Sequence, residues 1–306
     1  MRKTVLTTTA LLLLGASSAF AQTNVQGNSS DTNYVQVGAS NFPGDAPAGY
    51  AGISMVRPGT SPIVWSGFVN IAAAPIQQAT TFATTANVNG PFWAPLPDAS
   101  ATIAQVWRTD SSYNATADTF SLRQVITPAV PMPAFGGLVI GRVNGTSMGN
   151  GVYFGEWAPQ GTPTTAPSTD LNMTDSRRTV WYVGDNAVSS TPIMLAVQYN
   201  VAGIRQTGVG ANLPSAPDLY NGTLTANYLP GLINSLGGSI ANSSDTVNFN
   251  GTTIASNGTF GNGTNIEGRF YNGAAALAGI YTGGAGTADD VAFGGSRNGT
   301  GIVITP

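Results

Sequence analysis

Few side chains in this sequence could do chemistry, and those are carboxylates, arginines and aromatic residues. Asp289 and Asp290 form an adjacent carboxylate pair. Paired carboxylates serve in acid–base catalysis and in cation binding. Neighbouring residues of a strand point to opposite faces, however. We therefore expect the pair to occupy a turn or the start of a strand.

Arginines could recognise an anion at two places. Arg177 and Arg178 could together hold a carboxylate or phosphate through paired hydrogen bonds, but we favour a solvated strand start. Arg297 is interpreted as a residue that caps a barrel rather than one that contacts a ligand. The glycine-rich run at 283–286 lacks the strand–turn–helix context of a phosphate-binding loop.

The missing residue types restrict catalysis further. The chain has no histidine and no cysteine. Histidine completes the ordinary serine triad and is the usual acid–base group at neutral pH. It is also the commonest ligand of haem iron and of metal ions, so its absence excludes the usual form of each of these sites. A glycan-processing enzyme would need two carboxylates about 5–10 Å apart, and Glu156 and Glu267 are the only glutamates. We predict no catalytic residues and no metal site.

The candidate ligand-binding residues are aromatic. Phe92 and Trp93 lie between Pro91 and Pro95, and Tyr113 lies in a polar stretch nearby in the sequence. Large aromatic side chains in loops are costly to expose and are enriched at binding hot spots. Phe92, Trp93 and Tyr113 are therefore the predicted ligand-binding set, the alternative being that Trp93 fills the core of its own domain.

The N-terminus carries an export signal. Arg2 and Lys3 precede an apolar run at 5–14, and the small residues at 18–21 suit signal peptidase. The run is too short for a permanent membrane span, which needs roughly 20 apolar residues. We predict cleavage after Ala21 and a secreted or cell-surface protein. With no cysteine to carry lipid, it is not a lipoprotein, and no later segment is expected to span a membrane.

Composition favours a packed, acidic, exported protein. Cleavage would leave nine arginines against 14 acidic residues, a net charge near −5. A nucleic-acid binder needs a basic face, which this composition does not supply. Hydrophobic residues make up 42% of the chain and five are tryptophans, which predicts a packed core rather than disorder.

The elements that must position these residues are short strands. Runs of β-branched and aromatic residues alternate with Gly, Asn, Asp and Pro, and several Asn-Gly dipeptides suit hairpin turns. In the first part we predict strands at 34–38, 63–71, 104–109, 119–126, 138–143 and 152–157, followed by a linker at 159–168. Later strands are predicted at 178–183, 194–204, 220–228, 236–240, 246–250, 252–256, 265–271, 276–281 and 290–293. Closing the later set into a barrel would remove exposed edges, and glycines at 237, 238, 268 and 279 would let the strands bend.

The last third of the sequence resembles a known family. The residues Gly268-Arg269-Phe270-Tyr271-Asn272-Gly273 through Gly279-Ile280-Tyr281, followed by Phe293-Gly294-Gly295-Ser296-Arg297, resemble the closing barrel strands of transferrin-binding-protein-B-like proteins. The segments at 180–185 and 196–204 resemble the first two strands of that barrel. The match covers about residues 176–298, whereas the N-terminal part resembles the family's handle region only in composition and position.

The resemblance implies a fold, a route of export and a class of function. It implies an all-β protein with a β-rich handle domain at 22–170, after the signal peptide at 1–21, and an eight-stranded antiparallel barrel at 171–306. Such proteins leave the cell through an outer-membrane translocator of the Slam type, and bind host proteins or haem. Without a lipidated cysteine the chain is nearest the soluble, hemophilin-like branch, yet haem is disfavoured as a cofactor because histidine is absent.

We therefore expect an exported, non-enzymatic protein of a Gram-negative-type bacterium that captures a host-derived ligand outside the cell. The ligand would be haem, an iron-carrier protein or another host protein, and an outer-membrane receptor is a further possible partner. The handle would carry the ligand and the barrel the export signal. The alternative is a structural or adhesive surface protein, such as a surface-layer, fimbrial or matrix component.

Overall fold

The computed structural model describes residues 24–41, 47–55, 67–73, 82–84, 102–109, 114–124, 136–159, 175–205, 219–283 and 287–305. The predicted signal peptide, the predicted linker beyond Pro159 and all three predicted ligand-binding residues, Phe92, Trp93 and Tyr113, lie outside these ranges. The described part contains strands, one 3₁₀ helix (η3, Thr287–Asp289) and no α-helix, which confirms the all-β class. In the same residues, no helix has the length and apolar character needed to cross a membrane.

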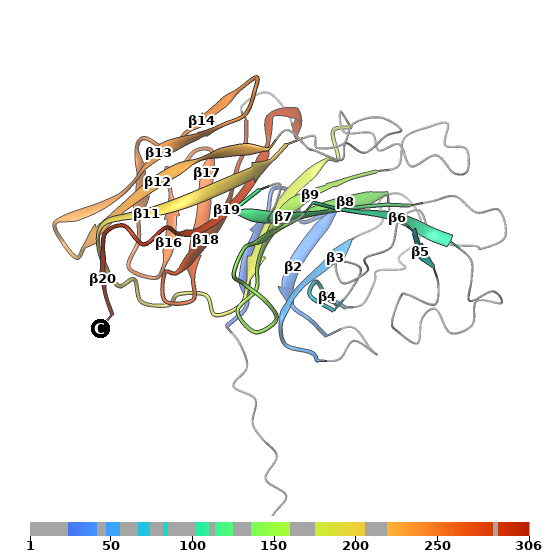
Figure 1. Cartoon of the computed structure of the whole chain (residues 1–306), viewed down its shortest axis with the longest axis horizontal. Coiled ribbons are helices and arrows are strands. Elements are labelled where there is room, and N and C mark those ends of the chain that lie inside the picture. Colours follow the sequence, from blue (N-terminus) through green and yellow to red (C-terminus); the bar gives the residue numbers. More distant parts are fainter. Residues whose placement is uncertain are drawn as a thin grey trace, which may run out of the picture.

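The strands form three sheets that lie side by side (Figure 1). A closed barrel lies at one end of the molecule, a seven-stranded sheet covers one of its sides, and a three-stranded sheet covers the other face of the seven-stranded sheet. The seven-stranded sheet has the order β1 (Gln26–Ser29), β10 (Thr179–Gly184), β9 (Val152–Ala158), β8 (Gly137–Val143), β7 (Ala117–Gln124), β6 (Thr102–Thr109), β5 (Phe82–Thr84). The small sheet has the order β2 (Val35–Ala39), β3 (Ala51–Met55), β4 (Val69–Asn70).

Eight antiparallel strands close the barrel, as the sequence predicted. The ring closes because β12 pairs with both β11 and β13. Two short strands lie off this ring: β14 (Thr246–Asn248) pairs with β13, and β20 (Ile302–Ile304) pairs with β11. In order around the barrel, the eight are β12 (Tyr220–Leu229), β11 (Ile193–Ile204), β19 (Val291–Arg297), β18 (Ala276–Tyr281), β17 (Ile266–Tyr271), β16 (Thr259–Gly261), β15 (Thr252–Ile254) and β13 (Ile233–Ala241).

The assignment of residues 178–183 to the barrel was wrong. Residues 179–183 belong to β10, which pairs with β9 and β1 in the seven-stranded sheet. All six residues of β10 are buried. A strand buried on both faces lacks the alternation of polar and apolar residues that distinguishes one sheet from another, so local sequence could not assign it. The eighth barrel strand is instead β16, a three-residue strand that the sequence pattern did not reveal.

The barrel interior is filled by its own side chains. Tyr199, Phe249, Phe260, Phe270 and Phe293 meet there, all at most 3% exposed. The rings of Phe249 and Phe293 contact edge to face at 4.9 Å between centroids. An eight-stranded barrel is just wide enough for side chains to fill. The barrel is therefore a packed core.

The seven-stranded sheet is buried on both sides because it joins the two outer layers. On one face Phe154 and Tyr182 pack with Ile280 and other residues of β11, β18 and β19 on the outside of the barrel. On the opposite face Trp157 and Trp181 pack against residues of β2 and β3. This arrangement explains why β9 and β10 have no exposed residue.

Glycines behave as the sequence predicted at most turns. A four-residue loop, 272–275, joins β17 to β18, and the Ala275 amide donates to the Asn272 carbonyl at 3.1 Å. The central residues of this turn are Gly273 and Ala274, with φ of 63° and 65°, so the predicted two-residue Asn-Gly turn is shifted by one residue. Gly145, Gly251, Gly258, Gly263 and Gly299, each after an asparagine, also have positive φ. Asn221-Gly222 was predicted as a turn but lies within β12, where a Cβ on Gly222 would collide with the carbonyl of Ser239.

Candidate functional site

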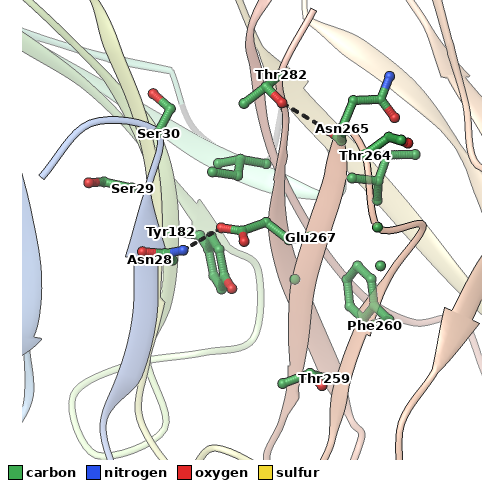
Figure 2. A pocket seen from close by; sticks show the side chains of 15 residues that line it. Asn28, Ser29, Ser30, Tyr182, Thr259, Phe260, Thr264, Asn265, Glu267 and Thr282 are labelled. Atoms are coloured by element: carbon green, nitrogen blue, oxygen red, sulfur yellow. Dashed lines mark hydrogen bonds between the residues drawn. The ribbon is translucent and has the colours of Figure 1, made fainter.

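A groove of about 710 Å³ lies where the seven-stranded sheet meets the outer face of the barrel (Figure 2). One wall is the edge strand β1 with Asn28, Ser29 and Ser30, and Tyr182 of the adjoining β10. The other wall consists of β16, β17, the turn between them, and Ile280 and Thr282 at the end of β18 (Ala276–Tyr281). Burial along β17 alternates, with Ile266, Gly268 and Phe270 facing the barrel core and Glu267 facing outward into the groove.

One contact joins the two walls. The side-chain amide of Asn28 donates to Glu267 Oε1 at 2.6 Å, across 239 positions of sequence. Figure 2 shows this hydrogen bond spanning the groove in front of the Tyr182 ring. Burial, reinforced by the negative charge of Glu267, raises the pKa of Tyr182 well above its usual value of 10, so this phenol stays neutral.

The remaining lining is uncharged and combines polar groups with the apolar side chains of Phe260, Ile266 and Ile280. Hydroxyl groups come from Ser30, Thr259, Thr264 and Thr282, and an amide comes from Asn265. Asn265 is held in place because the side chain of Asn262 donates to its Oδ1 at 2.7 Å, and its own carbonyl accepts from the Thr282 amide at 2.8 Å. Such groups form hydrogen bonds without contributing charge. Glu267 is the single carboxylate among the residues that line the groove.

The groove lining does not supply the carboxylate pair that glycoside hydrolysis requires. Glycoside hydrolysis uses two facing carboxylates, and Glu267 has no second carboxylate among the lining residues. The other glutamate, Glu156, is fully buried and paired with Arg178. Within the described ranges, no group of three or more acidic residues could hold a metal ion.

Arg178 corrects the expectation of a solvated strand start. Its side chain is 0% exposed and pairs with Glu156, with Nε 2.9 Å from Oε2. It also donates to the carbonyls of Thr287 and Asp290. Arg177 pairs instead with Asp175, which lowers the pKa of that carboxyl. Arg178 therefore joins β9 and β10 to the segment that leads into β19.

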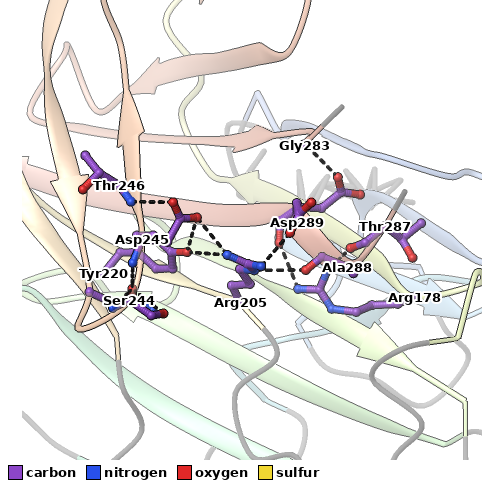
Figure 3. A network of polar contacts seen from close by, with 12 residues as sticks. Arg178, Arg205, Tyr220, Ser244, Asp245, Thr246, Gly283, Thr287, Ala288 and Asp289 are labelled. Atoms are coloured by element: carbon purple, nitrogen blue, oxygen red, sulfur yellow. Dashed lines mark hydrogen bonds and ion pairs between the residues drawn. The ribbon is translucent and has the colours of Figure 1, made fainter. Parts of the chain in front are cut away.

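Asp289 and Asp290 lie where the sequence predicted, at a turn before a strand. Asp289 ends η3, and its carboxylate accepts from Arg205 Nη2 at 2.6 Å (Figure 3). Asp290 is only 4% exposed and accepts from the Gly283 amide at 2.9 Å. Burial raises its pKa to about 6, although nearby Arg178 opposes the shift. The two carboxylates have different partners, so they do not act as a catalytic pair.

Arg205, at the end of β11, is the centre of the polar network in Figure 3. It donates to Tyr220 Oη at 3.1 Å, to Asp245 at 2.8 Å and to the Ala288 carbonyl at 3.0 Å, besides Asp289. Its partners come from η3, from β12 and from the turn between β13 and β14. The network thus links η3 to the barrel wall.

Arg297 has an exposed side chain at the end of β19, and its backbone amide donates to the Ala275 carbonyl at 3.0 Å. The three residues at 293–295, which precede it in the motif, contribute to packing. Phe293 points into the barrel core, and a Cβ on Gly294 would lie 2.5 Å from the ring of Phe154 in the seven-stranded sheet. A Cβ on Gly295 would collide with the Asn200 carbonyl of β11.

Sequence reasoning missed Asn28, Tyr182 and Glu267. The available signal was Glu267 itself, one of two glutamates in the chain, on the polar side of an alternating strand. Nothing in the sequence indicated that β1 would lie opposite it, because that contact depends on how the barrel packs against the sheet.

No protein-family model matches the chain. Among solved structures, the chain is similar to HpuA from Kingella denitrificans in complex with human haemoglobin, with 15% identity and a TM-score of 0.46, covering 91% of this chain and 88% of the other. It is also similar to apo HpuA, described as a haemoglobin receptor of the same organism, with 14% identity, a TM-score of 0.42, and coverage of 92% and 88%. Similarity at this level assigns no function to the chain.

Proposed function

We propose that this chain is an exported, non-enzymatic binding protein that captures a host-derived ligand outside the cell. The observation that carries the proposal is the chemistry of the groove between β1 and β17. It offers hydroxyl groups, amides and one carboxylate already engaged with Asn28, which is a set for recognition by hydrogen bonds. The barrel is filled by its own aromatic residues, so the ligand binds outside it.

Two regions could contact the ligand. The groove is one, and the predicted aromatic set Phe92, Trp93 and Tyr113 in the handle is the other. The aromatic set would suit a protein partner, since large aromatic residues dominate the energy of protein interfaces. The groove would suit the polar edge of the same partner or a glycan carried on it.

A capture experiment tests the proposal. The chain lacking residues 1–21 would be immobilised and exposed to haem, human haemoglobin, other host serum proteins and glycans. We expect saturable binding of one of these, weakened at least tenfold by Glu267→Ala or by Trp93→Ala. Ser239→Ala, at an exposed position of β13 outside the groove lining, is the matched control. Absence of saturable binding to every probe would refute the capture function.

Haem needs a separate measurement because the chain has no histidine. Any axial ligand from the protein would have to be a tyrosine or methionine. We expect no sharp Soret band when haem is added to the mature chain. A sharp band would establish haem as a ligand despite the missing histidine.

Export is proposed to use the signal peptide and then a Slam-type outer-membrane translocator, with an outer-membrane receptor as a further partner. The support is the N-terminal signal sequence together with the barrel motif around Phe293. Expression with and without a cognate translocator tests this step. If the amounts of protein at the surface and in the medium are the same with and without the translocator, the result contradicts this export route.

A structural or adhesive role is the second candidate. It is favoured by the low charge of the chain, 8% of residues, and its many Thr, Asn and Gly residues. Size in solution separates the two functions, because a surface-layer or fimbrial component would form fibres or large arrays. A small particle of defined size in solution would support the binding function.

A further inference from the structure

One end of the barrel exposes large aliphatic side chains. Five belong to the aliphatic end patch: Leu195 (37% exposed), Leu232 (78%), Ile233 (46%), Ile302 (57%) and Ile304 (53%). Single exposed aliphatic residues are common on protein surfaces, but contiguous groups mark contact sites. All five come from β11, β13, β20 and the turn before β13.

Strand register places the β20 residues beside β11, where Ile304 lies opposite Ile193 and Ile302 lies opposite Leu195. Ile233 lies opposite Leu229 of β12, the strand that pairs with the other side of β11. Residues that face each other across antiparallel strands share a face of the sheet. Val303, between Ile302 and Ile304, points the other way and packs against the barrel core. Figure 1 shows β20 and the β12–β13 turn at the same end of the barrel.

The patch includes an open strand edge. β20 pairs with β11 on one side, and no other described strand pairs with it. Within the described part of the chain, the other side of β20 therefore presents backbone N–H and C=O groups that no strand pairs with. Proteins usually protect such edges with lysine, proline or a bulge that turns the strand away. Ile302–Ile304 contains none of these side chains.

Charge and sequence symmetry indicate what could cover this edge. The described segments around the patch, 186–204, 219–244 and 298–305, contain no charged residue. Two copies of this acidic chain could therefore meet here without like-charge repulsion. The strand reads Ile-Val-Ile in both directions, so antiparallel pairing about a twofold axis places isoleucine opposite isoleucine.

We propose that a second copy of this chain docks at the β20 edge of the aliphatic end patch, with β20 pairing antiparallel to the β20 of that copy. A twofold contact uses the same patch on both copies and closes after two subunits. In this pairing Ile302 of one copy lies beside Ile304 of the other on the outer face, so apolar contact accompanies the backbone hydrogen bonds. The β20 edge is thus complementary to a second copy of itself in backbone hydrogen bonding, side chains and charge.

Sedimentation of the chain lacking residues 1–21, in a dilution series, tests the dimer. We expect twice the monomer mass at high concentration and the monomer mass on dilution. Ile302→Lys combined with Ile304→Lys, both at exposed positions, should weaken dimerisation at least tenfold, because four lysines would meet across the twofold axis. Ser239→Lys, on the outer face at the opposite end of β13, should leave it unchanged.

Cross-linking tests the register. The chain has no cysteine, so introduced thiols are the only ones. Ile302→Cys with Ile304→Cys should give disulfide-linked dimers on mild oxidation, whereas Ser239→Cys should stay monomeric. A monomer at every concentration, larger assemblies, binding to lipid vesicles as a monomer, or equal weakening by the β20 and Ser239 lysine variants would each overturn the proposal.

Discussion

At the scale of single residues, the ionisable side chains of the described structure mostly hold the fold together. Arg178 pairs with Glu156, Arg142 with Asp118, and Arg205 with Asp245 and Asp289. Asp185 accepts hydrogen bonds from the amides of Ala51, Gly149 and Gly151. Buried charges need such partners to offset desolvation.

Arg178→Met should destabilise the protein by about 3–5 kcal/mol, because it leaves the Glu156 carboxylate buried without its cation. The double variant Arg178→Met with Glu156→Leu should recover part of that loss, since replacing both ions avoids the unpaired charge. Chemical denaturation would measure both free energies of unfolding. If the double variant loses as much stability as the two single variants lose together, the result contradicts this role of the ion pair.

Asp290 gives the protein a pH-dependent stability. Its pKa in the folded state, about 6, lies above the usual value near 4, so the folded state binds a proton more readily than the unfolded state. This contribution to stability is fully present below about pH 4 and is lost as the pH rises through about 6.

Asp290→Asn, which keeps the oxygen that accepts from Gly283, should remove this part of the pH dependence. The difference in the free energy of unfolding, wild type minus variant, should fall by on the order of 1–3 kcal/mol as the pH rises from 4 to 7. Asp245→Asn, whose carboxylate is 42% exposed and pairs with Arg205, is the control. A difference independent of pH would show that Asp290 does not titrate in this range.

At the scale of elements, glycines allow close approaches between strands and layers. Gly268 and Gly279, expected to let strands bend, instead make room for the rings of Phe260 and Phe293. Gly238 does adopt a positive φ, 118°. Gly294 makes room for Phe154, where the barrel packs on the seven-stranded sheet.

Gly294→Ala should therefore destabilise the protein by about 1–3 kcal/mol, because the added methyl would overlap the Phe154 ring. Gly237→Ala is the matched control in another barrel strand, since its Cβ would meet nothing closer than 3.9 Å. We expect the control to change stability by less than about 1 kcal/mol. Thermal denaturation of both variants would measure the difference, and equal effects would refute the packing argument.

At the scale of the whole molecule, the seven-stranded sheet and the barrel share a core. Ala202, Tyr271 and Ile280 of the barrel pack with Val152 and Phe154 of the sheet. The Tyr271 hydroxyl also donates to the Gln26 carbonyl of β1 at 2.9 Å. Neither part can unfold without exposing the shared surface.

We predict a single cooperative unfolding transition for the described part of the molecule. Gly294→Ala at the barrel side and Asp185→Asn at the sheet side should lower the same transition temperature. Calorimetry would test this through the agreement of calorimetric and van't Hoff enthalpies. Two separable transitions, each lowered by one variant, would show that the parts unfold independently.

Much of the fold could be predicted from the sequence. Alternation in segments such as 194–204 and 220–228 identified the barrel strands, because one face of each is buried and the other is exposed. The short strands β1, β16 and β20 escaped prediction, since three or four residues carry no period. β10 was assigned to the wrong sheet because it is buried on both faces.

The candidate site was less predictable. Residue types excluded histidine- and cysteine-based chemistry, and this conclusion needed no structure. The groove required the tertiary structure, because Asn28 and Glu267 are separated by 239 positions and meet only when the sheet packs against the barrel.

The sequence by itself determined the all-β class, the barrel and the poverty in catalytic groups, because these follow from local alternation and composition. Only the tertiary structure decided that Arg178 is a buried ion-pair partner, that Gly294 is an interlayer contact, and that the barrel is solid. The physical reason is the same in each case. Burial and pairing depend on which distant surfaces come together, and a chain of short strands carries little local information about that choice.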